Sequence, residues 1–167
     1  MKEELKAMDG AGGGGDYKRA MLDLKAKHRE SSNLDGNWAQ PKLTSSHGVH
    51  QDRRQHNRPQ WWETTFQGNK NFEVGKLTYM KRADGPTSQF PTAVRIQYYD
   101  EAKRRWNWYK KAAWIPTGVK RNDPTKKVHN IVMKPTFEAR IIRIHLDRAH
   151  NNEGWFSGRY DWWIRPV

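Results

Sequence analysis

The chain has 167 residues, a formal net charge of +13, nine tryptophans and no cysteine. This length suits one domain with its own hydrophobic core. The lack of cysteine excludes disulfide bonds and thiolate chemistry and fits a reducing compartment. The charged first residues predict no signal peptide, and there is no apolar run of about 18 residues that would form a membrane span. We therefore expect an intracellular protein without membrane insertion.

Most of the positive charge lies beyond the first 34 residues. Residues 1–34 hold seven Lys or Arg and six Asp or Glu, a balance of +1, and the remaining residues hold 24 and 12, a balance of +12. A field of this kind favours acidic partners. These include nucleic acid, an anionic membrane surface and an acidic protein, and charge alone does not choose among them.

The first predicted unit is an N-terminal arm, residues 1–37. Its glycine run at 10–15 predicts a flexible hinge, and the run lacks the lysine and hydroxyl ending of a phosphate-binding loop. Asp16 is expected to cap a helix over residues 17–30. One face of that helix carries Tyr17, Met21, Leu24 and His28. We expect this face to pack either on its own domain or in a groove of another protein.

Turn-forming residues at 31–37 end the predicted helix, and the second unit, residues 38–167, is rich in aromatic and β-branched side chains. Strands are predicted at 61–66, 72–80, 93–99, 106–110, 128–133, 139–146 and 162–165. Turns are predicted at 68–69, 84–86, 122–124 and 151–154. Many short strands with no helical pattern between them predict an all-β fold, an antiparallel β-sandwich.

Tryptophans and arginines within these strands carry further predictions. Adjacent residues of a strand face opposite sides, so one of Trp61 and Trp62, and one of Trp162 and Trp163, should face outward. The arginines of the closing strands, Arg140, Arg143 and Arg165, are expected to serve the sandwich rather than a substrate.

Five segments occur in an order that resembles one known family. They are 43–46, the tryptophan-led 60–66, 94–100 with Trp106 after it, Ala-Arg-Ile-Ile-Arg-Ile at 139–144, and 163–165. This order resembles the discoidin, or coagulation factor 5/8 type C, family of galactose-binding-like domains over roughly residues 40–167. The resemblance implies a jelly-roll β-sandwich and a binding function. The terminal cysteine pair of secreted members is absent here, so the likeness is to cysteine-free relatives.

The loops of such a fold are where binding is expected. Their predicted tips, at 47–58 and 81–88, are hydrophilic, which argues against insertion into a bilayer while leaving electrostatic contact open. Candidate ligand or partner contacts are His47, His50, Arg53, Arg54, His56, Arg82, Trp155 and Arg159.

The loop at 47–58 also carries side chains that can bind a metal ion. His47, His50 and His56, with Asp52, are residue types that bind zinc or nickel, but their spacing matches no closed site. Sugar-binding members of the resembled family often hold calcium, yet no loop here is rich in carboxylates. We predict no cofactor, with a structural calcium ion as the one alternative that the resemblance leaves open.

The sequence contains no nucleophile elbow, paired-carboxylate signature or metal-hydrolase motif, so we predict a protein that is not an enzyme. A hinged amphipathic arm favours a docking module, a structural subunit of a larger intracellular assembly such as a ciliary or organellar complex. One alternative is a cysteine-free carbohydrate-binding lectin, with Trp155 as its loop-borne aromatic contact. The other is an electrostatic binder of nucleic acid or acidic filaments, suggested by the basic and aromatic segment 103–111.

Overall fold

A computed structural model of the chain describes residues 16–31, 60–80, 91–118, 128–146 and 159–167. The strands are β1 (Lys18–Arg19), β2 (Lys27–Glu30), β3 (Gln60–Thr65), β4 (Phe72–Met80), β5 (Ala93–Asp100), β6 (Arg105–Trp108), β7 (Ile115–Pro116), β8 (Val128–Ala139), β9 (Ile141–Leu146) and β10 (Arg159–Pro166). A single-turn 3-10 helix, η3 (Tyr109–Ala112), follows β6.

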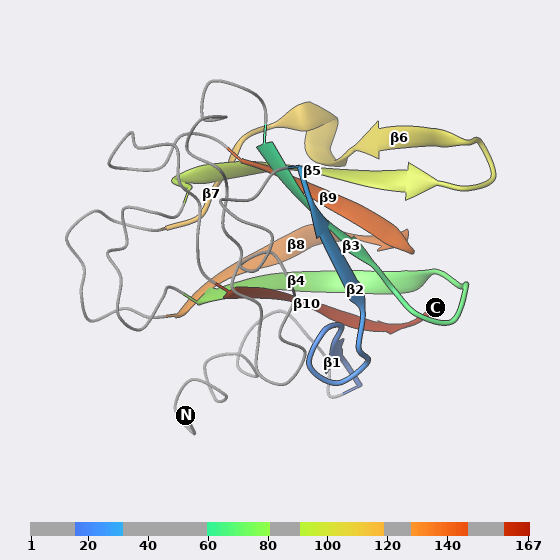
Figure 1. The fold of residues 1–167 in the computed structure, drawn as a ribbon. Helices are drawn as coiled ribbons and strands as arrows, with labels where there is room; N and C mark the ends of the chain where they lie inside the picture. Colours follow the sequence, from blue (N-terminus) through green and yellow to red (C-terminus); the bar gives the residue numbers. More distant parts are fainter. Residues whose placement is uncertain (1–15, 32–59, 81–90, 119–127, 147–158) are drawn as a thin grey trace.

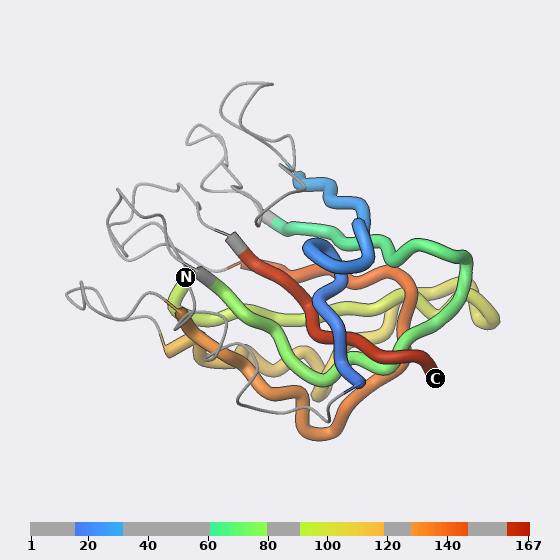
Figure 2. Tube along the Cα trace, turned by 90° about the horizontal axis from the view of Figure 1, so that it is seen from below, coloured from blue at the N-terminus to red at the C-terminus, as the bar shows by residue number. Residues whose placement is uncertain are grey.

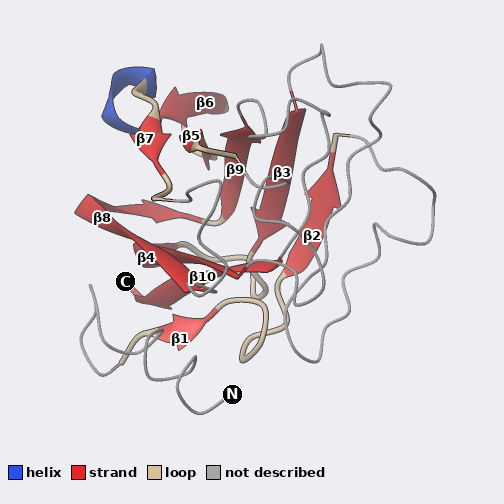
Figure 3. Ribbon diagram, turned by 90° about the vertical axis from the view of Figure 1, so that its left-hand side faces the viewer, coloured by secondary structure: helices blue, strands red, loops and turns tan. Residues whose placement is uncertain are grey.

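The strands form two antiparallel sheets that face each other (Figure 1). The smaller sheet has the order β1-β10-β4-β8, and the larger sheet has the order β2-β3-β9-β5-β6 with β7 paired to β5. Figure 3 shows the two layers from the side. The predicted antiparallel β-sandwich is confirmed.

From residue 60 onward, strand positions follow the sequence pattern closely except at β7, which corresponds to no predicted strand, and at the break between β8 and β9. A break was predicted between 133 and 139, but β8 continues to Ala139 and the chain turns at Arg140 instead. Lys76 of β4 pairs with Val132 and Val74 pairs with Phe137, so the intervening part of β8 has no partner residue on β4. Pro135 lies in that unpaired part, where its missing N–H removes no ladder hydrogen bond.

The predicted helix over residues 17–30 is wrong. This segment forms β1 on the smaller sheet, a turn, and β2 on the larger sheet, and thereby connects the two layers (Figure 2). Asp16 does not cap a helix; its carboxylate lies 3.3 Å from Arg165. Of the two packing alternatives, contact with its own domain is the one observed. The predicted boundary at 37/38 lies outside the described residues.

A carboxylate that is distant in the sequence explains why this segment does not form the predicted helix. Asp161 of β10 accepts hydrogen bonds from the backbone N–H of Met21, at 2.8 Å, and of Leu22, at 3.1 Å. Ala20 and Met21 are fully buried in the core. Tertiary contacts thus outweigh a local helical period, as they commonly do for short amphipathic segments.

The core lies between the sheets and is built from alternating positions of the strands. In β9, Ile142, Ile144 and Leu146 face inward, and the residues between them do not. The Trp62 ring stacks on the Tyr160 ring, with centroids 5.2 Å apart and planes 2° apart, which joins the larger sheet to the smaller. Such burial and aromatic stacking supply the main stabilising contribution to a sandwich of this size.

The outward-tryptophan prediction is correct for one pair only. Trp62 is buried and Trp61 is half-buried on the other face of β3. Trp162 and Trp163 are both buried. Trp163 does lie on the opposite face from Trp162, but Tyr17 packs beside it and its indole N–H donates to Thr78 Oγ1 at 2.9 Å.

Candidate functional site

The residues predicted to contact a ligand belong to segments that join the sandwich at one end. His47, His50, Arg53, Arg54, His56, Arg82 and Trp155 lie outside the described residues. Arg159 opens β10, where it pairs with Met80 at the end of β4, and Met80 pairs with Val128 at the start of β8. On the larger sheet, Gln60 pairs with Leu146. These strand ends lie toward the left in Figure 1.

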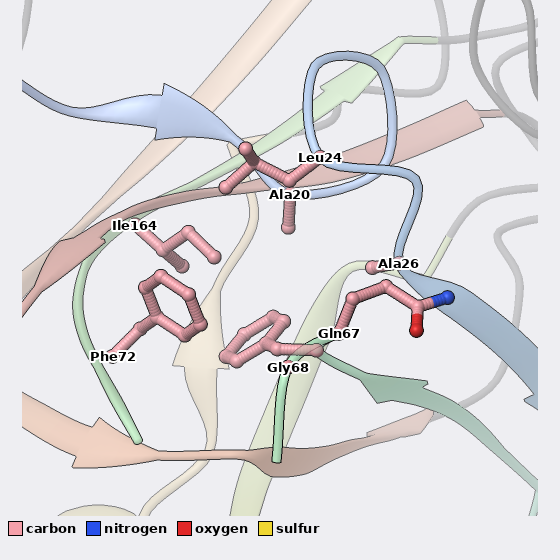
Figure 4. Close-up of a pocket in the computed structure, with 8 residues that line it drawn as sticks. Ala20, Leu24, Ala26, Gln67, Gly68, Phe72 and Ile164 are labelled. Atoms are coloured by element: carbon pink, nitrogen blue, oxygen red, sulfur yellow. The ribbon is translucent and has the colours of Figure 1, made fainter. Parts of the chain in front are cut away.

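A small cavity lies at the opposite end of the sandwich (Figure 4). Its volume is about 160 Å³, and its walls are mostly apolar. It is lined by Ala20, Leu24, Ala26, Phe66, Gln67, Gly68, Phe72 and Ile164. The one side-chain amide, that of Gln67, donates to the Lys25 carbonyl. Few polar groups are left to orient a ligand there, so this cavity is not the candidate site.

The outer face of the larger sheet is the side that points away from the smaller sheet (Figure 3), and it carries polar and aromatic side chains from several strands. Cross-strand pairing aligns one row of side chains across it. In register across β2, β3, β9, β5 and β6, this row is Arg29, Glu63, Arg143, Gln97 and Trp108. A second row holds Trp61, His145 and Arg95.

Arg143 occupies the centre of this face between two tryptophans. Its guanidinium carbon lies 4.2 Å from the Trp61 ring centroid and 4.4 Å from that of Trp106. Its Nε donates to Glu63 Oε1 at 2.8 Å, and Arg29 donates to the other oxygen of Glu63 at 3.1 Å. The prediction that Arg143 serves the sandwich agrees with this arrangement, and Arg140 and Arg165 likewise pair with Glu101 and Glu73.

Arg95 has a similar aromatic setting without the carboxylate. Its guanidinium carbon lies 4.9 Å from the Trp108 ring centroid and 4.4 Å from that of Trp114. Its Nε is buried without a hydrogen-bond partner, and no ion pair to Arg95 is found among the described residues. Trp108 and Trp114 are 38% and 46% exposed, which makes this the most open part of the aromatic face.

His145 lies in the second row. It pairs with Arg95 of that row and is two residues from Arg143 on the same strand. Its Nε2 lies 2.7 Å from Gln97 Oε1, and its ring lies 4.9 Å from that of Trp108. Burial, together with the positive charges of Arg95 and Arg143, lowers the pKa of His145 to about 4. The imidazole is therefore neutral at physiological pH, with Nε2 as the donor to Gln97.

This lowered pKa predicts a dependence of stability on pH. The folded pKa lies below the value of about 6.5 expected in the unfolded chain, so protonation favours unfolding. The stabilisation is fully present above about pH 6.5 and is lost as the pH falls toward 4. His145→Gln removes the titration, so the free energy of unfolding of the native protein should fall relative to that of the variant between about pH 7 and about pH 4.5.

Urea unfolding followed by tryptophan fluorescence measures both proteins at the two pH values. Because every other titrating group is common to them, the difference isolates His145. Parallel pH profiles for the two proteins would contradict the prediction.

Sequence reasoning missed the outer face as a unit. The alternation of Arg95, Gln97 and Tyr99 on β5, and of Arg143 and His145 on β9, marks polar residues on one side of each strand. What the sequence does not show is that β9 lies between β3 and β5, which brings the arginines and tryptophans together.

The described residues hold no group of three or more His, Cys, Asp or Glu side chains placed to bind a metal ion. No helix in the described ranges has the length and apolar character needed to cross a membrane.

Comparisons with known proteins agree with this architecture. The structure is similar to discoidin II from Dictyostelium discoideum, with a TM-score of 0.67 and 16% identity, covering 92% of this chain and 60% of that chain. It is also similar to the family 32 carbohydrate-binding module of NanJ from Clostridium perfringens, solved with galactose, with a TM-score of 0.65 and 13% identity, covering 88% of this chain and 98% of that chain.

An F5/8 type C domain from Bacteroides fragilis gives a TM-score of 0.64 at 9% identity, covering 92% of this chain and 100% of that chain. This chain thus spans 60% of the length of discoidin II and the whole length of the isolated domain. Comparison with the curated proteins finds no match. The family model for the F5/8 type C domain matches residues 27–159, most of the sequence, including β2 in the segment predicted to be an arm. The chain therefore belongs to the F5/8 type C domain family, the family that its strand motifs resemble.

Proposed function

We propose that the chain is a non-catalytic module that binds carbohydrate at the end of the sandwich where residues 32–59, 81–90 and 147–158 join the strands. The observation that carries this proposal is the likeness of the fold to modules solved with sugars. One of these was solved with galactose, one with a GalNAc-galactose disaccharide and one with Lewis b. The family is one of binding domains, which supports a role without catalysis.

The residue types in those segments suit sugar recognition. An indole ring such as that of Trp155 offers a flat apolar surface to the C–H face of a pyranose, and Arg82, Arg159 and His47 carry donors for hydroxyl groups. Arg159 begins β10, so its backbone is fixed by pairing with Met80. A contact anchored on a strand is better positioned than one carried by a loop alone.

A docking function is the second candidate. The predicted helical arm no longer supports it, because residues 17–30 belong to the sandwich. The support is now the outer face of the larger sheet, where tryptophans and arginines lie together. These residue types are enriched among the energetic centres of protein interfaces. A subunit of an intracellular assembly would dock through this face, and its partner surface would be acidic.

The carbohydrate proposal predicts that Trp155→Ala lowers glycan affinity by about tenfold or more, the loss expected when a central aromatic contact is truncated. Glycan-array binding, followed by calorimetry on the best glycan, measures the effect. Trp114→Ala is the matched control, because it removes an exposed tryptophan from the outer face, and it should leave glycan affinity unchanged.

Two results would contradict the proposal. One is an array with no bound glycan at any concentration tested. The other is an equal loss of glycan affinity in Trp155→Ala and Trp114→Ala, since the ligand would then not distinguish the strand-end site from the outer face.

A further inference from the structure

The outer face of the larger sheet contains two arginines on adjacent strands, each placed against two tryptophan rings. Arg143 on β9 lies against Trp61 and Trp106, and Arg95 on β5 lies against Trp108 and Trp114. The two settings differ in one respect. Arg143 donates to the carboxylate of Glu63, whereas the described residues provide no carboxylate to Arg95.

Glu63 shows that the arginines of this face bind a carboxylate. Its side chain is 8% exposed, and its two oxygens receive hydrogen bonds from Arg143 and Arg29. A planar carboxylate matches the geometry of guanidinium donors, and the bond is strengthened by charge. Arg95 has the same kind of donor group, and the Trp114 ring beside it is 46% exposed.

We propose that Arg95, Trp108 and Trp114 form a carboxylate-binding site through which the outer face docks an acid-rich, extended segment of a partner protein. This inference rests on the docking function and is independent of carbohydrate binding at the strand ends.

Charge complementarity supports an acidic occupant. The charged side chains on this face are Lys27, Arg29, Arg95 and Arg143, and among the described residues they face one carboxylate, Glu63. Neighbouring His145 is neutral, so the positive charge at the centre of this face is that of Arg95 and Arg143. With a formal charge of +13, a second copy of this chain is a poor partner for the same face.

The aromatic rings favour a carboxylate over a stacked base or sugar. Binding of single-stranded nucleic acid uses open aromatic faces on which bases stack. Here the guanidinium of Arg95 already lies against both Trp108 and Trp114, and that of Arg143 lies against Trp61 and Trp106. The rings therefore hold the arginines in place for an anionic ligand, and part of their stacking surface is occupied.

The test uses the full chain and a fluorescent peptide of alternating glutamate and serine, with glutamine replacing glutamate in a control peptide. Arg95→Met keeps a long apolar side chain between the two rings and removes the charge and donors. We expect it to weaken binding of the acidic peptide about tenfold, the effect of losing one charge-assisted contact. Arg19→Met, which removes the same charge from β1 on the smaller sheet, should weaken it less than about threefold.

Heparin oligosaccharide and single-stranded oligothymidine are measured in parallel. If Arg95→Met and Arg19→Met weaken peptide binding equally, the proposal is wrong. It is also wrong if Arg95→Met selectively weakens heparin or oligothymidine binding but not that of the peptide.

In the native protein, addition of the acidic peptide should shift the indole N–H signals of Trp108 and Trp114 in NMR spectra, a readout that does not depend on a variant's folding. Trp155→Ala should leave peptide binding intact, so failure here is separable from failure of the carbohydrate proposal.

Discussion

Asp161→Ala is expected to lower the free energy of unfolding by about 2–4 kcal/mol, because it removes the acceptor of three backbone N–H groups, those of Met21, Leu22 and Trp162. The carboxylate lies in the core at 3% exposure and accepts from Met21 and Leu22, which belong to the turn between β1 and β2. Without these bonds the turn is held to β10 more weakly, chiefly by the hydrogen bond from the Ala20 N–H to the Trp162 carbonyl. The segment that joins the two sheets should then open before the rest of the sandwich.

Urea unfolding measures the loss of stability, and hydrogen exchange at residues 17–31 measures the local opening. Asp23→Ala is the matched control, since Asp23 pairs with Arg19 at the surface of the same turn and its loss should cost less than about 1 kcal/mol. Equal destabilisation by the two changes would show that Asp161 does not anchor the segment.

Asp161 also adds a pH dependence that opposes that of His145. Burial raises the pKa of Asp161 to about 7, against an ordinary value of 3.8. The folded state binds the proton more tightly than the unfolded state, so this group makes the domain less stable as the pH rises from about 4 to about 7. In Asp161→Asn this fall with rising pH should disappear. The His145 contribution, which has the opposite sign over the same range, should then dominate the profile.

The strands of the sandwich could be predicted because their information is local. In β9, inward Ile142 and Ile144 alternate with outward Arg143 and His145, and that period is visible in the sequence. The family motifs follow the same strands. The turn at Gly68 and Asn69 could also be predicted from the local sequence. Its positive φ angles of 90° and 55° suit these two residue types.

The N-terminal segment could not be predicted because what fixes it is distant in sequence. The partner of Met21 is Asp161, separated by 140 positions, and no local pattern records that contact. The helical spacing of Tyr17, Met21 and Leu24 instead reflects burial of Tyr17 against the smaller sheet and of Met21 in the core. The same limit applies to the outer face, since Arg95 and Trp114 meet only through the pairing of β5 with β7.

Gly75 in β4 shows a second long-range contact that the sequence conceals. Lys76 pairs with Trp163 and Val74 pairs with Ile164, so Gly75 is the extra residue of a β-bulge. The Tyr17 ring covers it. A Cβ atom at position 75 would lie 2.5 Å from Tyr17 Cε1 and 2.7 Å from Cζ, closer than such atoms can approach. Only glycine leaves room for this ring.

Gly75→Ala is therefore expected to displace Tyr17 and destabilise the domain by about 2–4 kcal/mol, from overpacking together with a lost hydrogen bond. The hydroxyl of Tyr17 donates to Glu73 at 2.8 Å, and Glu73 in turn pairs with Arg165. Urea unfolding measures the loss of stability.

Burial and the Glu73 contact raise the pKa of Tyr17 to about 12. Displacing the ring should return this pKa toward 10, which can be followed by ultraviolet absorbance.

A double-mutant cycle with Tyr17→Ala isolates the clash. Once the ring is absent, alanine at position 75 has nothing to strike, so Tyr17→Ala/Gly75→Ala should be hardly less stable than Tyr17→Ala alone. Fully additive costs would mean that glycine is required at position 75 for the backbone of the bulge, and that the ring rests on it without constraining it.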